Sequence, residues 1–567
     1  MALAEPKFAR DAAVPHVSAR AFSRVVAMPA FARLATLCVG LVGVETLVLL
    51  HLDAGSALAL APQIAAPAPW GVFHDDRWLL AYAGSWPALV AGAIVLIVVR
   101  AVLTAAMVKA AWPSTAEPLS WRKALARSGS STVVAALLLS PCASLLVAFS
   151  LAPISDLWLA AIPAALGIAI FVHHGPVDCW WLRHPRLRSI GWVLLSYIEL
   201  TVAGAVIVMV PRAWVPAIAI AAGLADAWAW RGFVRALARP ARARLAPVSP
   251  LGLAGVVGIT VLGVTAAATP PSPASDAPPA HHTVAAATQH PPRDVLLVSG
   301  YGVHWNGNAP SLGPGFSARE FSYRGTTKEG RPLAYKASAT QQPLPVLLQK
   351  FRAQVRQLAM QSGHNIDIVG ESEGSLLATI YLLTTPNPPV DHVVLLSPLV
   401  RPARGSYPAP GQDGPGLGAG WVLRGIANAT DSLTPLHVSA DSPFIESLGT
   451  HADALSQIFG CPVAGVEQFA VLPLADAVGV PPHTLNTVPH KTVTALHGTL
   501  LANRDVRHDV ARYLLGAASP GAGHNTVEKL AAAASSAWQS PPLRLHTEPP
   551  TDVGCAQAAA ALRSWLG

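Results

Sequence analysis

The chain has 567 residues, of which 52% are hydrophobic and only 12% are charged. A soluble protein of this length would carry about 25% charged residues, so the composition excludes a purely soluble protein and indicates several membrane-spanning segments. The net charge is +8, but the arginines cluster between apolar runs, and residues 294–567 show no basic stripe with interleaved aromatic residues. We therefore expect no nucleic-acid partner.

The N-terminal half holds nearly all the long apolar runs, which fall within residues 31–268 and follow a short segment at 1–30. A helix that crosses a membrane needs roughly 20 mainly apolar residues. Seven runs meet or approach this length, at residues 34–52, 86–107, 131–152, 157–172, 190–210, 214–230 and 251–268. The sequence predicts an α-helical membrane domain with about seven transmembrane helices.

Positive charge is concentrated in alternate connections between these runs. Lysine and arginine are frequent before the first run and after the second, fourth and sixth, whereas the first external connection carries Asp53, Asp75 and Asp76. Because connections rich in lysine and arginine stay in the cytoplasm, the N-terminus is expected inside and the chain after residue 269 outside the plasma membrane. The run at 214–230 decides this orientation, since a chain without it would emerge on the other side.

Four ionisable residues lie inside or beside the predicted spans, namely Glu45, Arg100, Glu199 and Asp226. Such residues are by default candidates for a transport or proton path. No paired motif joins them, so we interpret them as partners in interhelical hydrogen bonds, with Arg100 also able to extend its head group towards the membrane surface.

A proline-rich segment at 269–293 separates the membrane domain from the rest of the chain. Its composition is typical of an extended linker. His281 and His282 are adjacent there and are expected to face solvent, so no metal site is predicted. Residues 294–567 are long enough to bury a core of their own as one domain.

Strand-like and helix-like segments alternate in this C-terminal half. Helices are expected at 343–363, from 375 onwards and at 505–516, and strands at 294–302, 319–325, 366–370, 391–399, 466–476 and 491–498. This alternation predicts a doubly wound, mostly parallel sheet. Residues 400–465 are rich in glycine and proline and form an insertion that is expected to cover the sheet edge as a cap or lid.

One short motif carries the chemistry. The sequence Gly-Glu-Ser-Glu-Gly at 370–374 follows the strand at 366–370 and precedes a helix. In such an elbow the serine backbone is strained, and Gly370 and Gly374 let neighbouring chains pass closely, so that Ser372 Oγ is exposed at the carboxyl edge of the sheet. The pattern predicts Ser372 as a nucleophile, with an ordinary glycine-rich turn as the alternative.

A nucleophilic serine needs a base, and the base needs an acid that orients it. His497 follows the last predicted strand and is the candidate base, while Asp476 ends the strand at 466–476 and is the candidate acid. This gives the chain order Ser, Asp, His that accompanies the elbow. The competing residues, each of which fits a surface position or a helix cap, are His451, His483, His490, His508, Asp441, Asp453 and Asp505.

The oxyanion of an acyl-transfer intermediate needs backbone donors. One is expected from Glu373, directly after the nucleophile, and the second from Tyr301 in the loop "SGYG" after the first strand. Glu371 and Glu373 flank Ser372 and would also fit a carboxylate pair for glycoside chemistry. At an elbow they are more consistent with residues that tune or cap the site.

Residues 294–516 resemble the α/β-hydrolase superfamily, and the elbow "GESEGS" together with "HGTLL" is similar to its lipase and esterase members. The whole chain, with alanine-, arginine- and proline-rich spans ahead, resembles membrane-anchored α/β-hydrolases of actinobacteria. The resemblance implies Ser372 as nucleophile, Asp476 as acid and His497 as base. Ser299-Gly300 stands where many lipases carry His-Gly, which leaves the second oxyanion donor open.

We therefore expect a membrane-anchored serine hydrolase that cleaves carboxylic esters, lipid or acyl esters in particular, without a metal or cofactor. Two alternatives stay open. An extracytoplasmic acyltransferase would use the same triad with an alcohol in place of water, and a catalytically inactive binding or sensor protein would keep only the fold.

Only two of the five cysteines fall in the predicted external domain, where oxidation is permitted. Their pairing, Cys461 with Cys555, would join the segment before the Asp476 strand to the C-terminal helix. Two unpaired buried thiols are the alternative. The other three, expected as free thiols in spans or a cytoplasmic loop, are Cys38, Cys142 and Cys179.

Overall fold

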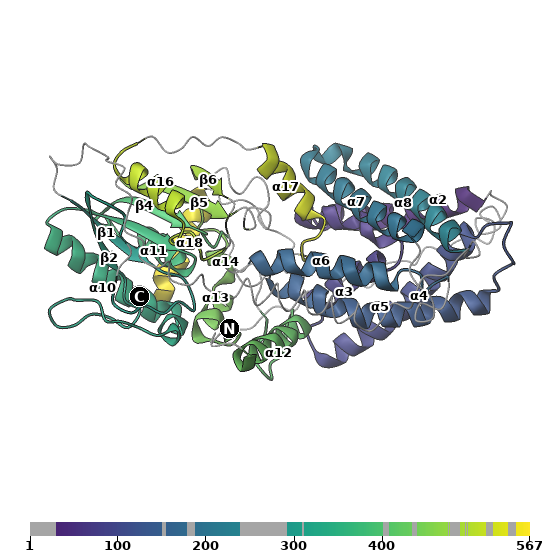
Figure 1. Ribbon diagram of the computed structural model, residues 1–567, viewed down its shortest axis with the longest axis horizontal. Helices are drawn as coiled ribbons and strands as arrows, with labels where there is room; N and C mark the ends of the chain where they lie inside the picture. The colour runs from purple at the N-terminus through teal and green to yellow at the C-terminus, as the bar shows by residue number, and fades with distance from the viewer. Residues whose placement is uncertain are drawn as a thin grey trace.

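The computed structural model consists of an N-terminal bundle of helices and a C-terminal half built on a parallel sheet (Figure 1). The residues that it describes are 30–149, 155–177, 187–238, 292–308, 311–400, 407–433, 439–473, 476, 488–493, 495, 497–517, 526–541 and 552–566.

The bundle follows the predicted apolar runs. Its long helices are α2 (Ala30–His51), α4 (Trp86–Ala111), α5 (Trp121–Phe149), α6 (Ser155–Val172), α7 (Leu187–Met209) and α8 (Val215–Ala238). In the described part of the chain, five segments are long and apolar enough to cross a membrane: α2, α4, α5, α7 and Arg212–Ala238, which contains α8. Helix α6 covers the fourth run, and its part Ala161–Val172 is apolar but shorter than these five. The seventh run, 251–268, and nearly all of the linker at 269–293 lie outside the described residues.

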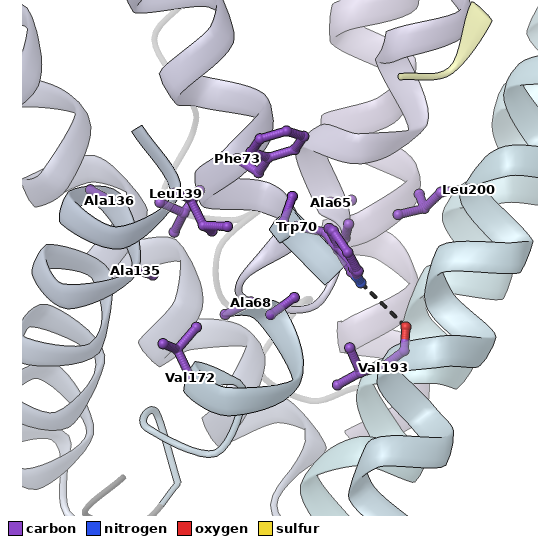
Figure 2. Close-up of a cluster of buried hydrophobic side chains, with 14 of the residues drawn as sticks. Ala65, Ala68, Trp70, Phe73, Ala135, Ala136, Leu139, Val172, Val193 and Leu200 are labelled. Carbon is purple, nitrogen blue, oxygen red and sulfur yellow. Dashed lines mark hydrogen bonds between the residues drawn. The ribbon is translucent and has the colours of Figure 1, made fainter. Parts of the chain in front are cut away.

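The connection between the first two predicted spans differs from the expectation. Instead of a polar loop, it forms η1 (Gly55–Ala65) and α3 (Trp70–Tyr82), which pack against α2, α5 and α7 inside the bundle. Figure 2 shows Trp70 from α3 at the centre of the buried cluster, its indole N–H donating to the carbonyl oxygen of Val193 on α7 at 3.3 Å. The charged residues in this segment made it read as an external loop. His74 and Asp76 are buried and Asp75 is largely so, because partners on α2, α4 and α5 satisfy them. Asp53 stays exposed and pairs with Arg212.

Buried ion pairs hold α3 in place. Arg100 on α4 donates to both carboxylate oxygens of Asp75 at 2.6 Å. His74 lies 2.9 Å from Glu45 on α2 and 3.1 Å from Asp75. Glu45 and Arg100 thus make the helix-to-helix contacts expected of them, and Arg100 points inward rather than towards the membrane surface.

In the described part of the C-terminal half, six parallel strands form one sheet in the order β2-β1-β3-β4-β5-β6. The strands are β1 (Arg293–Val298), β2 (Phe316–Glu320), β3 (Ile366–Glu371), β4 (Val390–Leu396), β5 (Glu467–Pro473) and β6 (His490–Val493). The prediction of a doubly wound parallel sheet is confirmed to this extent. Its second strand was placed too late, because Phe321 and Tyr323 leave the sheet and pack as core residues beside Phe351 on the next helix.

Helices cover both faces of the sheet. One face packs against α10 (Leu344–Ser362), α11 (Glu373–Thr384) and α18 (Asp552–Leu566), and the other against α16 (Arg504–Leu514). The strands alternate between these two cores: Leu296 and Ile368 face the first, whereas Val295 and Val369 face the second. This is the period-2 pattern of a pleated strand buried on both sides.

The two halves touch through segments that the sequence placed wholly in the external domain. The 400–465 insertion contains α12 (Leu417–Leu433), α13 (Pro443–Thr450) and α14 (Ala452–Leu455), and α12 packs against α3, α4 and α5. Further on, α17 (Thr526–Ser536) packs against α7 and η1. Directly after it, Trp538 stacks on Tyr197 of α7 at 4.6 Å and donates to Thr201 at 2.8 Å. The C-terminal half is therefore docked into the bundle (Figure 1).

Candidate active site

Ser372 occupies the turn between β3 and α11, as the motif predicts. Its backbone has φ 54° and ψ −111°, a conformation that residues with a side chain rarely adopt. A Cβ at Gly374 would lie 2.3 Å from the carbonyl oxygen of Val298, and one at Gly370 would lie 2.6 Å from the Gly374 carbonyl. Glycine is therefore required on both sides because strand β1 and helix α11 approach the turn closely.

The structure brings the predicted base and acid to this serine. His497 follows β6, and its Nε2 lies 2.7 Å from Ser372 Oγ. Its Nδ1 lies 2.8 Å from Asp476 Oδ2, just beyond the end of β5. With the proton on Nδ1, the imidazole donates to Asp476 and accepts the Ser372 hydroxyl proton at Nε2. This is the arrangement that general-base activation of a serine requires.

The rival residues are placed elsewhere. His451 stacks on Trp565 with ring centroids 4.0 Å apart, and His490 Nδ1 donates to the Val488 carbonyl. Asp441 pairs with Arg424. Of the others, Asp453 lies in α14, Asp505 and His508 lie in α16, and His483 is outside the described residues.

The loop after β1 lies beside the nucleophile, where a second oxyanion donor is expected. A Cβ on Gly300 would be 3.1 Å from Ser372 Cβ and 3.6 Å from its Oγ. The next residue, Tyr301, is anchored by its hydroxyl, which lies 2.9 Å from Ser442 Oγ and 3.0 Å from the Ser439 carbonyl oxygen. Glu373 is the first residue of α11, so its N–H has no intrahelical acceptor. The loop at Gly300 and the first turn of α11 thus flank Ser372, where the two oxyanion donors are expected.

Three buried carboxyl groups surround the elbow, and each has a different setting. Glu371 Oε1 accepts the Leu500 N–H at 2.7 Å, which ties the loop after His497 to the end of β3. Burial raises the pKa of Glu371, against the lowering effect of that hydrogen bond. Burial also raises the pKa of Glu373 well above its usual range, and neither of its side-chain oxygens has a hydrogen-bond partner among the described residues.

The third carboxyl group, Glu320 at the end of β2, was not singled out from the sequence. Its Oε1 accepts from Ser299 Oγ at 2.5 Å and from the Tyr335 hydroxyl at 3.3 Å. Burial raises its pKa to about 7. The sequence signal was weak, because a glutamate at a strand end normally reads as a surface residue. Its contact with Ser299 makes it a support for the loop that carries Gly300 and Tyr301.

The two cysteines of the C-terminal half lie close together. Cys461 and Cys555 form a disulfide with their Cα atoms 5.7 Å apart, which links the segment before β5 to α18. Cys38 and Cys142 are free and buried, whereas Cys179 is outside the described residues. Among the residues that the structure describes, no group of three or more histidine, cysteine, aspartate or glutamate side chains is arranged to hold a metal ion.

None of the protein-family models, curated proteins or solved structures with which the chain was compared matches it. The chemistry of the site therefore has to be judged from its own geometry. A serine with a strained backbone, an imidazole in contact with its hydroxyl and a carboxylate on the far ring nitrogen are suited to covalent acyl transfer.

Proposed function

We propose that the protein is a membrane-anchored serine hydrolase of the α/β-hydrolase type that cleaves carboxylic esters, with lipid or acyl esters as the substrate class. The observation that carries the proposal is the continuous contact from Ser372 through His497 to Asp476 at the carboxyl edge of a parallel sheet. The strained elbow and the chain order Ser, Asp, His support the hydrolase type. The ester and lipid class follows from the resemblance of the elbow to lipases and esterases.

In this mechanism Ser372 Oγ attacks the ester carbonyl carbon while its proton moves to His497 Nε2. The negative charge on the carbonyl oxygen is met by the N–H groups of Glu373 and Tyr301. The carbon–oxygen bond of the ester then breaks, and the leaving alcohol takes the proton from Nε2. Water attacks the acyl-serine, again giving a proton to Nε2, and the carboxylic acid leaves as Ser372 regains its proton. Asp476 stays ionised and stabilises the imidazolium.

A fluorophosphonate probe tests the nucleophile directly. We expect the full-length protein in nanodiscs to be labelled on Ser372, and Ser372→Ala to lose all labelling. Ser397→Ala is the matched control, because Ser397 also follows a strand, is buried and has a positive φ of 44°, and its hydroxyl has no partner among the described residues. Equal labelling of wild type and Ser372→Ala would overturn the proposal.

The acyltransferase alternative shares the acyl-serine and differs in the acceptor. Product analysis with and without an added lipid or sugar alcohol separates the two. Release of free carboxylic acid at an unchanged rate in the presence of the alcohol supports a hydrolase. Transfer of the acyl group to the alcohol in preference to water identifies a transferase.

We further infer that the sheet half lies outside the plasma membrane. The Trp86 end of α4 is next to α12 of the C-terminal half, whereas Lys109, near the other end of α4, packs over Trp121, close to Arg122 and Lys123. The positive end is the cytoplasmic end by the positive-inside rule. The Cys461–Cys555 disulfide fits an oxidising compartment as well. Reporter fusions after residues 245 and 275 test this: the first should behave as cytoplasmic and the second as external.

A further inference from the structure

Helix α12 has one face inside the bundle. Ala419 is fully buried in the bundle core, and Leu423 and Ile426 pack against that core. A Cβ on Gly418 would lie only 2.9 Å from Leu80 of α3, which shows how closely α12 approaches the bundle. α12 is therefore fixed at the level of the membrane helices, although it belongs to the insertion between two strands of the sheet.

Among the described side chains of α12, those on the opposite face are exposed and carry no charge. Trp421, Gly425, Asn428 and Ala429 are exposed and recur at the i, i+4, i+7 and i+8 spacing of a single helical stripe. Trp421 is 63% exposed. A water-facing stripe on a surface helix is usually charged or strongly polar, so this stripe is unusual for a helix that meets only water.

Trp421 continues a surface of the bundle. Its ring meets that of Trp86 edge-on, with centroids 6.2 Å apart, and Trp86 is the first residue of α4. Along the same side of α4 follow Val90, Ile94 and Val98, each more than half exposed. Apolar side chains along a candidate membrane span with tryptophans at its end match the lipid-facing core and interfacial aromatic belt of membrane helices.

We propose that α12 is an interfacial helix whose Trp421–Gly425–Asn428–Ala429 stripe lies in the phospholipid headgroup region of the leaflet on the sheet side. An amphipathic helix binds there with its apolar side chains at the boundary between headgroups and acyl chains. Tryptophan suits this depth, because its ring is apolar and its indole N–H still reaches water or headgroup oxygens. The absence of charge along the stripe means that no ion has to be dehydrated.

The interfacial helix is tied to the candidate active site. Arg424 on α12 donates to both carboxylate oxygens of Asp441 at 2.7–2.9 Å. The neighbouring Ser442 is bonded to Tyr301 of the loop beside the nucleophile. If the proposed function holds, on which this step rests, the site takes its ester from the adjoining leaflet, so the substrate class is a membrane-resident lipid ester.

Depth-dependent quenching tests the surface without relying on activity. Trp421→Cys and Gly425→Cys are made in full-length protein that also carries Cys38→Ala, Cys142→Ala and Cys179→Ser. Each is labelled with an environment-sensitive fluorophore in nanodiscs of phosphatidylcholine and phosphatidylglycerol. A Cβ at Gly425 meets no atom within 4 Å, so this second variant keeps the test open if replacing Trp421 disturbs the fold. Met360→Cys is the control, because Met360 is 76% exposed on α10, which lies at the far end of the sheet half (Figure 1).

We expect lipids with a nitroxide near the headgroup end of the acyl chain to quench the labels at 421 and 425 several-fold more than the label at 360. Aqueous iodide should show the reverse order. Equal iodide quenching at all three sites would overturn the proposal. Protection that appears only as the protein concentration rises would also overturn it, since that result assigns the stripe to a second copy of the chain.

A second arm concerns the substrate. Trp421→Glu should slow hydrolysis of a lipid ester held in the nanodisc by roughly tenfold, and leave hydrolysis of a water-soluble short-chain ester unchanged. An equal fall for both esters would contradict entry from the leaflet. No hydrolysis of either ester by the wild-type protein would contradict the proposed function and leave the quenching result standing by itself.

Discussion

Both halves of the molecule contain a histidine held between two polar side chains, and these partners differ. In the sheet half, His497 has Asp476 on one ring nitrogen and Ser372 on the other. In the bundle, His74 has Asp75 on one nitrogen and Glu45 on the other. The first histidine can receive a proton from a hydroxyl and pass it on. The second lies between two carboxylates and also contacts the Trp78 indole N–H at 3.0 Å. No serine or cysteine among the described residues is bonded to it, so its contacts serve to join α2 to α3.

A histidine–carboxylate pair by itself therefore does not single out the candidate active site. What distinguishes the two is the third partner and the backbone that presents it. Ser372 is held at a positive φ at a sheet edge, while the bundle pairs lie on regular helices. In the bundle, Arg100 donates to both carboxylate oxygens of Asp75, so the charge of this carboxylate is compensated within the cluster.

Replacing each histidine is expected to give the largest difference in turnover between the two clusters. His497→Gln should lower ester hydrolysis by roughly 10³–10⁴-fold, because the serine loses its base. His74→Gln should leave the turnover within about twofold and lower the melting temperature in nanodiscs, because a helix contact is lost without touching the site. A large loss of turnover in both variants would show that the two clusters act together.

A further prediction concerns the ion pair between Arg100 and Asp75 in the bundle. Arg100→Met leaves the largely buried carboxylate of Asp75 without its main partner, and we expect the free energy of unfolding to fall by about 3–5 kcal/mol. The double variant Arg100→Met, Asp75→Leu should recover much of this loss, because no uncompensated charge remains. Thermal unfolding in nanodiscs measures both, and fluorophosphonate labelling at low temperature should persist in each.

A pH dependence specific to the sheet half is expected from Glu320. Its folded pKa of about 7 lies above the ordinary value of 4.5, so the folded state binds the proton more tightly than the unfolded state. Its contribution to stability is therefore full below pH 4.5 and is lost as the pH rises towards 7, by up to about 3 kcal/mol. Melting temperatures of Glu320→Gln should fall less than those of wild type across this interval. An equal fall in the melting temperatures of the two proteins would contradict this role of Glu320.

The smallest effect is expected at the loop after β1, which carries Gly300 and Tyr301. Tyr301→Phe removes the hydroxyl that bonds Ser442 and keeps the backbone N–H. We expect kcat to fall by up to about tenfold with KM nearly unchanged, since one hydrogen bond is worth about 1 kcal/mol. Tyr381→Phe is the matched control, because the Tyr381 hydroxyl is buried and has no hydrogen-bond partner among the described residues. If both variants behave alike, Tyr301 has no particular role in placing the loop.

Local patterns in the sequence were sufficient to predict the elements around Ser372. The order of strand, Gly-Glu-Ser-Glu-Gly and helix is a contiguous pattern, and the glycines at 370 and 374 are needed by the turn itself. Strand ends likewise indicated Asp476 and His497, because parallel strands bring their carboxyl ends to one edge. Apolar runs of sufficient length indicated the bundle helices.

Only the tertiary structure placed the segments whose polarity is satisfied by distant partners. The charged residues of α3 predict an external loop, but in the fold Asp75 is paired with Arg100 and His74 with Glu45, both on other helices. Trp538 and α12 read as parts of a separate external domain, and their docking depends on surfaces of α7, α3 and α4 far away in the chain. Composition and periodicity report what a residue prefers as its surroundings. Which partner provides those surroundings is decided only when the chain has packed.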